Sequence, residues 1–272
     1  MSKPYPAETL LIEGHDAIAF AHAQFSSNVN ALPTGHWQFS AWLDPQGRVK
    51  AFFHLARLGD EQLLLLLRGG NAADVAEALS RFVFRSKLTL TALAPRNLSA
   101  GSALPLHAVH HDRETILLGC ASHSLRISNE CAGDDAWRLP QLRSGWPWLP
   151  HAALNVLLPS ALSLHRLHAV VIDKGCYPGQ EIVARMHYRG GNKKHLHRIE
   201  MSSSDFSPTK IAGAVLRIQS HEKVWLLDVV HNDFGIEALA VLNDDVVAQA
   251  MNEKIESTDD GTSIRLCQTW SA

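Results

Sequence analysis

The chain has 272 residues, of which 46% are hydrophobic, and this is enough for a large core and for two or more packed domains. Charged residues make up 19% of the chain and the formal net charge is −2. This balance argues against a dedicated nucleic-acid binder, because neutralising phosphates requires a clear excess of Lys and Arg. Any basic patch must be local, and we expect no direct nucleic-acid partner.

The N-terminal residues 1–7 lack the basic stretch and the apolar segment of a secretory signal. Apolar runs such as Leu63 to Leu67 are far too short to cross a membrane. We therefore expect a soluble, cytoplasmic protein without a membrane partner. The sequence does not indicate an oligomeric state.

The cysteines are scattered and contain no CxxC pair, a distribution that fits neither a disulfide framework nor a zinc ribbon. We expect reduced thiols at all four positions, which are Cys120, Cys131, Cys176 and Cys267. Two histidine clusters, at 107–111 and 165–168, lack the acidic or cysteine residues that would complete a metal site. Hydrogen-bonded or exposed imidazoles are the favoured interpretation, with a metal as a minor option.

The first ninety residues predict an α+β arrangement. Residues 62–68 are leucine-rich without alternation, so this strand should be buried on both faces. Asn71 is a suitable N-cap for the helix that follows. In chain order we expect a strand at 8–12, a helix at 16–25, strands at 36–43, 49–55 and 62–68, a helix at 71–84 and a strand at 86–93.

The rest of the chain gives weaker signals, with strand pieces in the sequences AVHHD and TILLG between residues 95 and 135. The polar stretch 202–208 has the composition of a connection between domains. We therefore expect one region of two intertwined α+β subdomains at 1–201 and a second domain at 209–272. Short strands at 215–218, 224–230, 236–241 and 263–266 predict that this second domain is a small β-barrel.

Residues 169–196 hold the pattern with the clearest chemistry. Residues 170–172 predict a strand end, the next residues a turn, and Pro178 the first position of a helix. Cys176 would then precede a helix N-terminus, where backbone N–H groups and nearby cations favour the thiolate. The alternative is that Cys176 is a small buried hydrophobic residue, and spacing alone does not decide between the two.

The string KGCYPGQE at Lys174 to Glu181, followed by VAR and by RGGNKK at 189–194, resembles the signature of the YgfZ family. That family is similar to the glycine-cleavage T-protein, so the resemblance implies a cloverleaf with ferredoxin-like α/β parts around a folate cavity, plus the small C-terminal barrel. It implies tetrahydrofolate or a derivative as cofactor, and a role in iron–sulfur cluster assembly and, through cluster enzymes, in tRNA modification. The implied partners are iron–sulfur enzymes or assembly factors.

The resemblance also assigns candidate site residues. Cys176 matches the functional thiol, with a possible contact to a transient iron–sulfur cluster, and Lys174 and Tyr177 beside it are the other candidate catalytic residues. Trp137 resembles the tryptophan that lines the folate site, where an aromatic face suits a stacked pterin. The candidate cofactor-binding residues are Trp137, Arg143, Gln180, Glu181, Arg185 and Arg189.

Two departures from the related sequences bear on the activity. Arg143 stands where relatives have an acidic residue, and it offers only hydrogen-bond donors to a pterin. Where the T-protein has its functional Asp, this chain has Lys50, Ala51 and Phe52, none of which is a carboxylate. We therefore expect a folate-binding accessory protein rather than an enzyme. The alternatives are a folate-dependent one-carbon transferase and a thiol carrier that binds no folate.

Overall fold

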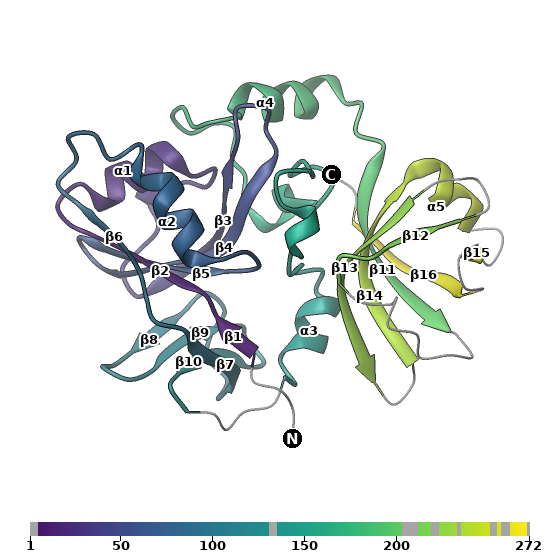
Figure 1. Ribbon diagram of the computed structural model, residues 1–272, viewed down its shortest axis with the longest axis horizontal. Coiled ribbons are helices and arrows are strands. Elements are labelled where there is room, and N and C mark those ends of the chain that lie inside the picture. The colour runs from purple at the N-terminus through teal and green to yellow at the C-terminus, as the bar shows by residue number, and fades with distance from the viewer. Residues whose placement is uncertain are drawn as a thin grey trace. The chain divides into compact units, whose positions relative to one another are not determined.

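The computed structural model forms two compact units, residues 1–137 with 168–180 and residues 138–167 with 181–272 (Figure 1). Among the residues described, no helix is long and apolar enough to cross a bilayer. The predicted mixture of helices and sheets is confirmed, and all described strand pairs are antiparallel. The structure describes residues 5–130, 135–202, 212–218, 223–232, 235–250, 255–256 and 262–270, so Cys131 lies outside the described part.

The main sheet of the first unit has five strands in the order β3-β4-β5-β2-β6. Helices α1 and α2 pack against one of its faces (Figure 1). The predicted elements up to residue 67 are confirmed with small shifts of their ends. The helices and strands of this part are β2 (Thr9–Glu13), α1 (Ala17–Gln24), η1 (Val29–Ala31), β3 (His36–Leu43), β4 (Val49–Gly59), β5 (Gln62–Leu67), α2 (Ala72–Ser80) and β6 (Thr89–Ala92).

Strand β5 is buried on both faces, as its unbroken leucines predict. Leu63, Leu65 and Leu67 join the core beneath the two helices, and Leu64 and Leu66 on the opposite face are also at most 1% exposed. Because each buried leucine side chain contributes about 2 kcal/mol, this strand is a major source of stability for the first unit.

Helix α2 begins as predicted, because the Asn71 side chain accepts hydrogen bonds from the backbone N–H groups of Ala73 (2.8 Å) and Asp74 (3.3 Å). The helix ends at Ser80, earlier than the predicted residue 84. The residues that follow form a turn in which Val83 packs against the core but Phe84 is 87% exposed. A continued helix would gain little further burial there.

A second sheet of the first unit has the order β1-β7-β10-β9-β8. Trp37 connects the two sheets, since its indole N–H donates to the Gly119 carbonyl at 2.9 Å. The strands predicted from AVHHD and TILLG are confirmed as β8 and β9. The bounds are β1 (Tyr5–Ala7), β7 (Arg96–Gly101), β8 (Val109–His111), β9 (Ile116–Gly119) and β10 (Ser124–Ser128).

The second unit is built on a six-stranded sheet with the order β12-β13-β14-β11-β16-β15. Its core gathers apolar side chains from β11, β13, β14 and α5. The bounds are α3 (Arg138–Arg143), η2 (His151–Ala153), η3 (Leu164–Leu167), α4 (Gln180–Arg189), β11 (Lys194–Ser202), β12 (Val215–Arg217), β13 (Lys223–Asn232), β14 (Gly235–Asn243), α5 (Asp244–Ala250), β15 (Ile255–Glu256) and β16 (Ser263–Trp270).

The predicted C-terminal barrel is not confirmed, because the described strand pairings run from β12 to β15 without a pairing that closes the sheet. Strand β11 also belongs to this sheet, although it precedes the predicted connection at 202–208. Most of that connection lies outside the described residues. The boundary between 1–201 and 209–272 therefore stays a prediction.

Candidate functional site

Cys176 is exposed on the loop that precedes α4. The predicted strand end at 170–172 is wrong, since these residues form bends and not a ladder. The Val171 N–H instead donates to the Ser26 carbonyl (2.9 Å), and the Ser26 hydroxyl donates to the Ala169 carbonyl (2.7 Å). These two hydrogen bonds attach the start of the loop to Ser26, and the Cys176 side chain is exposed to solvent.

Lys174 fastens this loop to the end of α1. Its ammonium group donates to the carbonyls of His22, Phe25 and Ser27, the last at 2.9 Å. An ammonium group has three donors, so all of them are used by the main chain, at a helix end where carbonyls lack partners. Burial lowers the pKa of Lys174 to about 8. The geometry makes Lys174 a positioning residue for the loop.

Gly179 and Gln180 provide two further attachments. Gly179 has φ +79°, and a Cβ on it would lie 2.5 Å from the Asp44 carbonyl in the β3–β4 turn. The Gln180 amide nitrogen donates to the carbonyls of Ile172 (2.9 Å) and Lys174 (3.3 Å). The positive φ of Gly179 also explains why α4 begins at Gln180 and not at the expected Pro178.

Tyr177, beside the thiol, is only 6% exposed. The Lys174 ammonium lies 5.1 Å from the centroid of its ring, a cation–π contact. Burial raises the pKa of Tyr177 to about 12, so the hydroxyl remains protonated at neutral pH. That hydroxyl is buried and has no hydrogen-bond partner among the described residues.

The other described cysteines are less accessible than Cys176. Cys120 is buried, and its thiol donates to the Leu118 carbonyl at 3.4 Å. Cys267 is half-buried on β16, where burial, together with Glu200, raises the pKa of its thiol. Within the described part of the chain, no three His, Cys, Asp or Glu residues lie close enough to hold a metal ion. Because iron–sulfur clusters usually take four cysteine ligands, Cys176 could supply only one of them.

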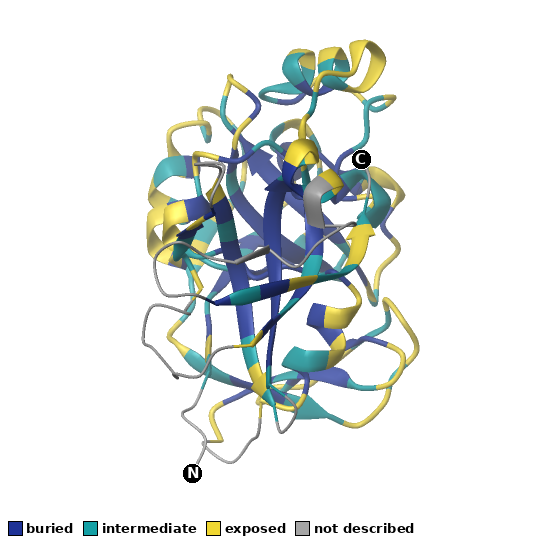
Figure 2. Ribbon diagram, turned by 90° about the vertical axis from the view of Figure 1, so that its right-hand side faces the viewer, coloured by how far each residue is buried: buried dark blue, intermediate teal, exposed yellow. Residues whose placement is uncertain are grey.

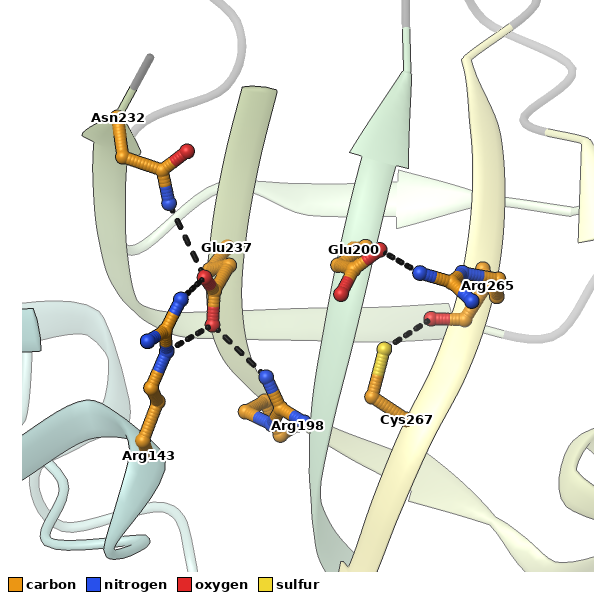
Figure 3. Close-up of polar contacts among 7 residues, drawn as sticks. All are labelled: Arg143, Arg198, Glu200, Asn232, Glu237, Arg265 and Cys267. Atoms are coloured by element: carbon orange, nitrogen blue, oxygen red, sulfur yellow. Dashed lines mark hydrogen bonds and ion pairs between the residues drawn. The ribbon is translucent and has the colours of Figure 1, made fainter. Parts of the chain in front are cut away.

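Arg143, at the end of α3, pairs with Glu237 on β14 (Figure 3). Its Nε lies 3.1 Å from Oε2 and its Nη2 2.5 Å from Oε1. Arg198 donates to the same carboxylate at 2.9 Å and Asn232 at 3.0 Å. The Arg143 guanidinium, followed by Arg198, holds the pKa of the buried Glu237 carboxyl below its usual range. A single Glu in the apolar strand sequence IEALAVL was the only signal for this site.

A second ion pair, between Arg265 and Glu200, lies on neighbouring strands of the same sheet (Figure 3). Both pairs line a pocket of about 500 Å³ in the second unit, and each guanidinium has a carboxylate partner. The lining residues are Arg143, Glu200, Met201, Ser202, Asn232, Gly235, Ile236, Glu237, Ser263 and Arg265.

No family model matches the chain. A tRNA-modifying protein YgfZ from Sodalis glossinidius is 25% identical over 281 residues, covering 86% of this chain and 85% of the relative. The YgfZ protein of Serratia proteamaculans is 24% identical over 285 residues, covering 88% and 86%. The crystal structure of the glycine cleavage system aminomethyltransferase T from Bartonella henselae superposes with a TM-score of 0.67 at 14% identity, over 96% of this chain and 82% of that one. These matches support a YgfZ-type, T-protein-like family for this chain.

The T-protein-like fold expected from the KGCYPGQE motif is thus confirmed. Within the KGCYPGQE motif, the residues that hold the loop of Cys176 in place are Lys174, Gly179 and Gln180. The motif therefore encodes a fixed loop that carries an exposed cysteine.

The residues expected to bind folate in a YgfZ-type protein lie in different surroundings. Trp137, in the first unit, is 1% exposed and packs edge-on against Tyr5, with ring centroids 5.2 Å apart. Glu181, Arg185 and Arg189 are exposed on α4 in the second unit. Gln180 and Arg143 are engaged in the contacts above. That all six residues face one cavity stays a prediction.

Proposed function

We propose that this YgfZ-type chain is a folate-binding accessory protein in tRNA modification, and that it supports iron–sulfur enzymes through the Cys176 thiol. The observation that carries the proposal is the exposed cysteine on a loop held by Lys174, Gly179 and Gln180. A fixed, accessible thiol can meet a cluster or a thiol of a partner protein, whereas a buried one cannot.

The proposed role is an accessory one and not catalysis of one-carbon transfer. Amine transfer needs a carboxylate close to the substrate nitrogen. At the positions matched to the T-protein Asp, the Lys50 ammonium lies 3.6 Å above the Trp42 ring, and Ala51 and Phe52 are buried in β4. These side chains supply no carboxylate.

Tetrahydrofolate is the proposed cofactor, and the residues present fit it in part. The buried Tyr177 hydroxyl, which has no partner among the described residues, is a donor that a bound pterin could satisfy. The exposed Arg185 and Arg189 can bind the carboxylates of a glutamate tail. Trp137 fits less well as a stacking platform, because it is closely packed by Tyr5.

Calorimetric titration with tetrahydrofolate tests the cofactor. Saturable binding below about 1 mM, a weak but specific affinity, is the expected result. Its absence would favour a thiol carrier that acts without folate. A parallel assay for transfer of a methylene or methyl group from the folate should be negative, and a positive result would support the transferase alternative.

A further inference from the structure

We propose that helix α4 and the two lysines after it bind single-stranded RNA, an inference that rests on the proposed role in tRNA modification. The surface consists of Arg185, Tyr188, Arg189, Lys193 and Lys194 and is named the α4 basic surface. All five residues belong to the second unit.

Helix α4 presents most of its side chains to solvent. Val183 is the only buried residue among its ten described positions, and Figure 2 shows the helix mainly in the colours of exposed and intermediate residues. Arg185, Tyr188 and Arg189 stand at positions i, i+3 and i+4, so they share one face of the helix. Tyr188 is 76% exposed, and its ring meets the neighbouring His187 ring at 84°, with centroids 5.1 Å apart. Such an exposed ring can stack on a flat ligand.

The chain extends this face beyond the helix. Gly190 and Gly191, at φ +69° and +98°, end α4 and turn the backbone. Lys193 and Lys194 follow at the start of β11, and both are exposed. The surface therefore continues along a turn of the chain.

The charge of this surface is uncompensated in the described part of the protein. No carboxylate described there forms an ion pair with any of the four cations. Glu181 is the one acidic residue of α4. Asp244, whose backbone N–H donates to the Lys193 carbonyl, directs its carboxylate to His195 at 3.3 Å. A polyanion would relieve the repulsion among the cations.

The composition of the surface favours RNA over an acidic protein. Protein interfaces are depleted of lysine at their centre and rely on an apolar core, whereas here one ring stands among four cations. Single-stranded RNA matches both features of this surface, because its phosphates can pair with the cations and its bases can stack on the aromatic ring. The cations are local, so the net charge of −2 does not oppose this.

Residues 81–87 of the first unit provide a matched control. They also combine an exposed ring, Phe84, with the exposed cations Arg81, Arg85 and Lys87. There, however, Arg81 lies 3.7 Å from Glu77, and the segment is a short turn without a helical face.

Fluorescence anisotropy with a labelled single-stranded RNA oligonucleotide tests the proposal on the full chain. For wild type, the slope of log K against log salt should approach about −2.8, or about 0.7 for each of four cations. Replacing Arg185, Arg189, Lys193 and Lys194 by Gln should abolish binding. Tyr188→Ala should weaken it about tenfold without changing the slope. Neutralising Arg81, Arg85 and Lys87 in the same way should change neither quantity.

Two results would overturn the proposal: wild-type affinity in the fourfold variant with its circular dichroism spectrum unchanged, or equal affinity for RNA and polyglutamate of the same charge. The second result would indicate a general anion surface for an acidic protein or a folate tail. Cys176→Ala should bind RNA like wild type, so a failure of the thiol role and a failure of RNA binding are distinguishable.

Discussion

The ammonium group of Lys174 donates a hydrogen bond to the carbonyl of Ser27, 147 positions earlier in the chain, across 2.9 Å. With the carbonyls of His22 and Phe25 it forms the connection between the loop of Cys176 and the end of α1. The position of the Cys176 thiol thus depends on Lys174. From its place in the motif alone, Lys174 would be expected to act as a cation that activates the thiol.

Lys174→Met should loosen this loop. The change leaves three carbonyls without donors, and we expect a loss of about 2 kcal/mol in the free energy of unfolding. Hydrogen–deuterium exchange should accelerate at 22–27 and 172–180. Lys87→Met, which removes an exposed cation from the same unit, is the control and should leave exchange at these residues unchanged. Equal protection in both variants would contradict the anchoring role.

Gly179→Ala should lower the free energy of unfolding by more than the strain of a positive φ alone would. Gly35 has φ +75°, and a Cβ added there would meet no atom within 4 Å, so Gly35→Ala isolates the backbone cost of about 1 kcal/mol. At Gly179 the new methyl group would also collide with the Asp44 carbonyl. Urea denaturation should show a loss of about 2–4 kcal/mol for Gly179→Ala. Equal losses in the free energy of unfolding for the two variants would contradict this, because the loop would then move away from the new methyl group at no cost.

Glu237→Gln should destabilise the second unit, because it leaves Arg143 and Arg198 facing a neutral amide at a site where the Glu237 side chain is 6% exposed. We expect a loss of about 2–3 kcal/mol in the free energy of unfolding. Glu200→Gln is the matched control, since Arg265 and Glu200 are more exposed and such pairs contribute at most about 1 kcal/mol. The free energy of unfolding of both variants should be measured by urea denaturation. Equal losses for Glu237→Gln and Glu200→Gln would contradict the prediction.

The second unit should lose stability in mild acid through His197. Burial, and then His195, lowers the pKa of His197 to about 4 from the ordinary 6.5. Between these values the unfolded chain binds more protons, so this contribution is complete above pH 6.5 and is lost as the pH falls toward 4. Its size is roughly 1.4 kcal/mol per pH unit. His197→Gln should flatten the pH dependence measured by urea denaturation, and an unchanged profile would exclude this histidine.

Local patterns in the sequence predicted most of the first unit. The leucines of β5 and the Asn71 cap depend on neighbours in the chain, and both are confirmed. The predicted strand at 170–172 was wrong because its β-branched residues meet the loop at Ser26 and no partner strand. Strand formation depends on such distant partners, which a single sequence does not show.

The candidate site was predictable in its chemistry and less so in its contacts. The KGCYPGQE motif identified Cys176, which is exposed. The anchoring role of Lys174 was missed because its acceptors are backbone carbonyls, which leave no mark on the sequence. The partner of Arg143 was missed because Glu237 lies 94 positions away.

The level of modified nucleosides in tRNA tests the central claim about Cys176 most directly. It should be measured in a bacterial strain that lacks its own YgfZ-type protein and carries the wild-type chain, Cys176→Ala or the control Cys267→Ala. The account predicts restored modification with the wild type and Cys267→Ala and none with Cys176→Ala, all three proteins being folded. Full restoration by Cys176→Ala would contradict it.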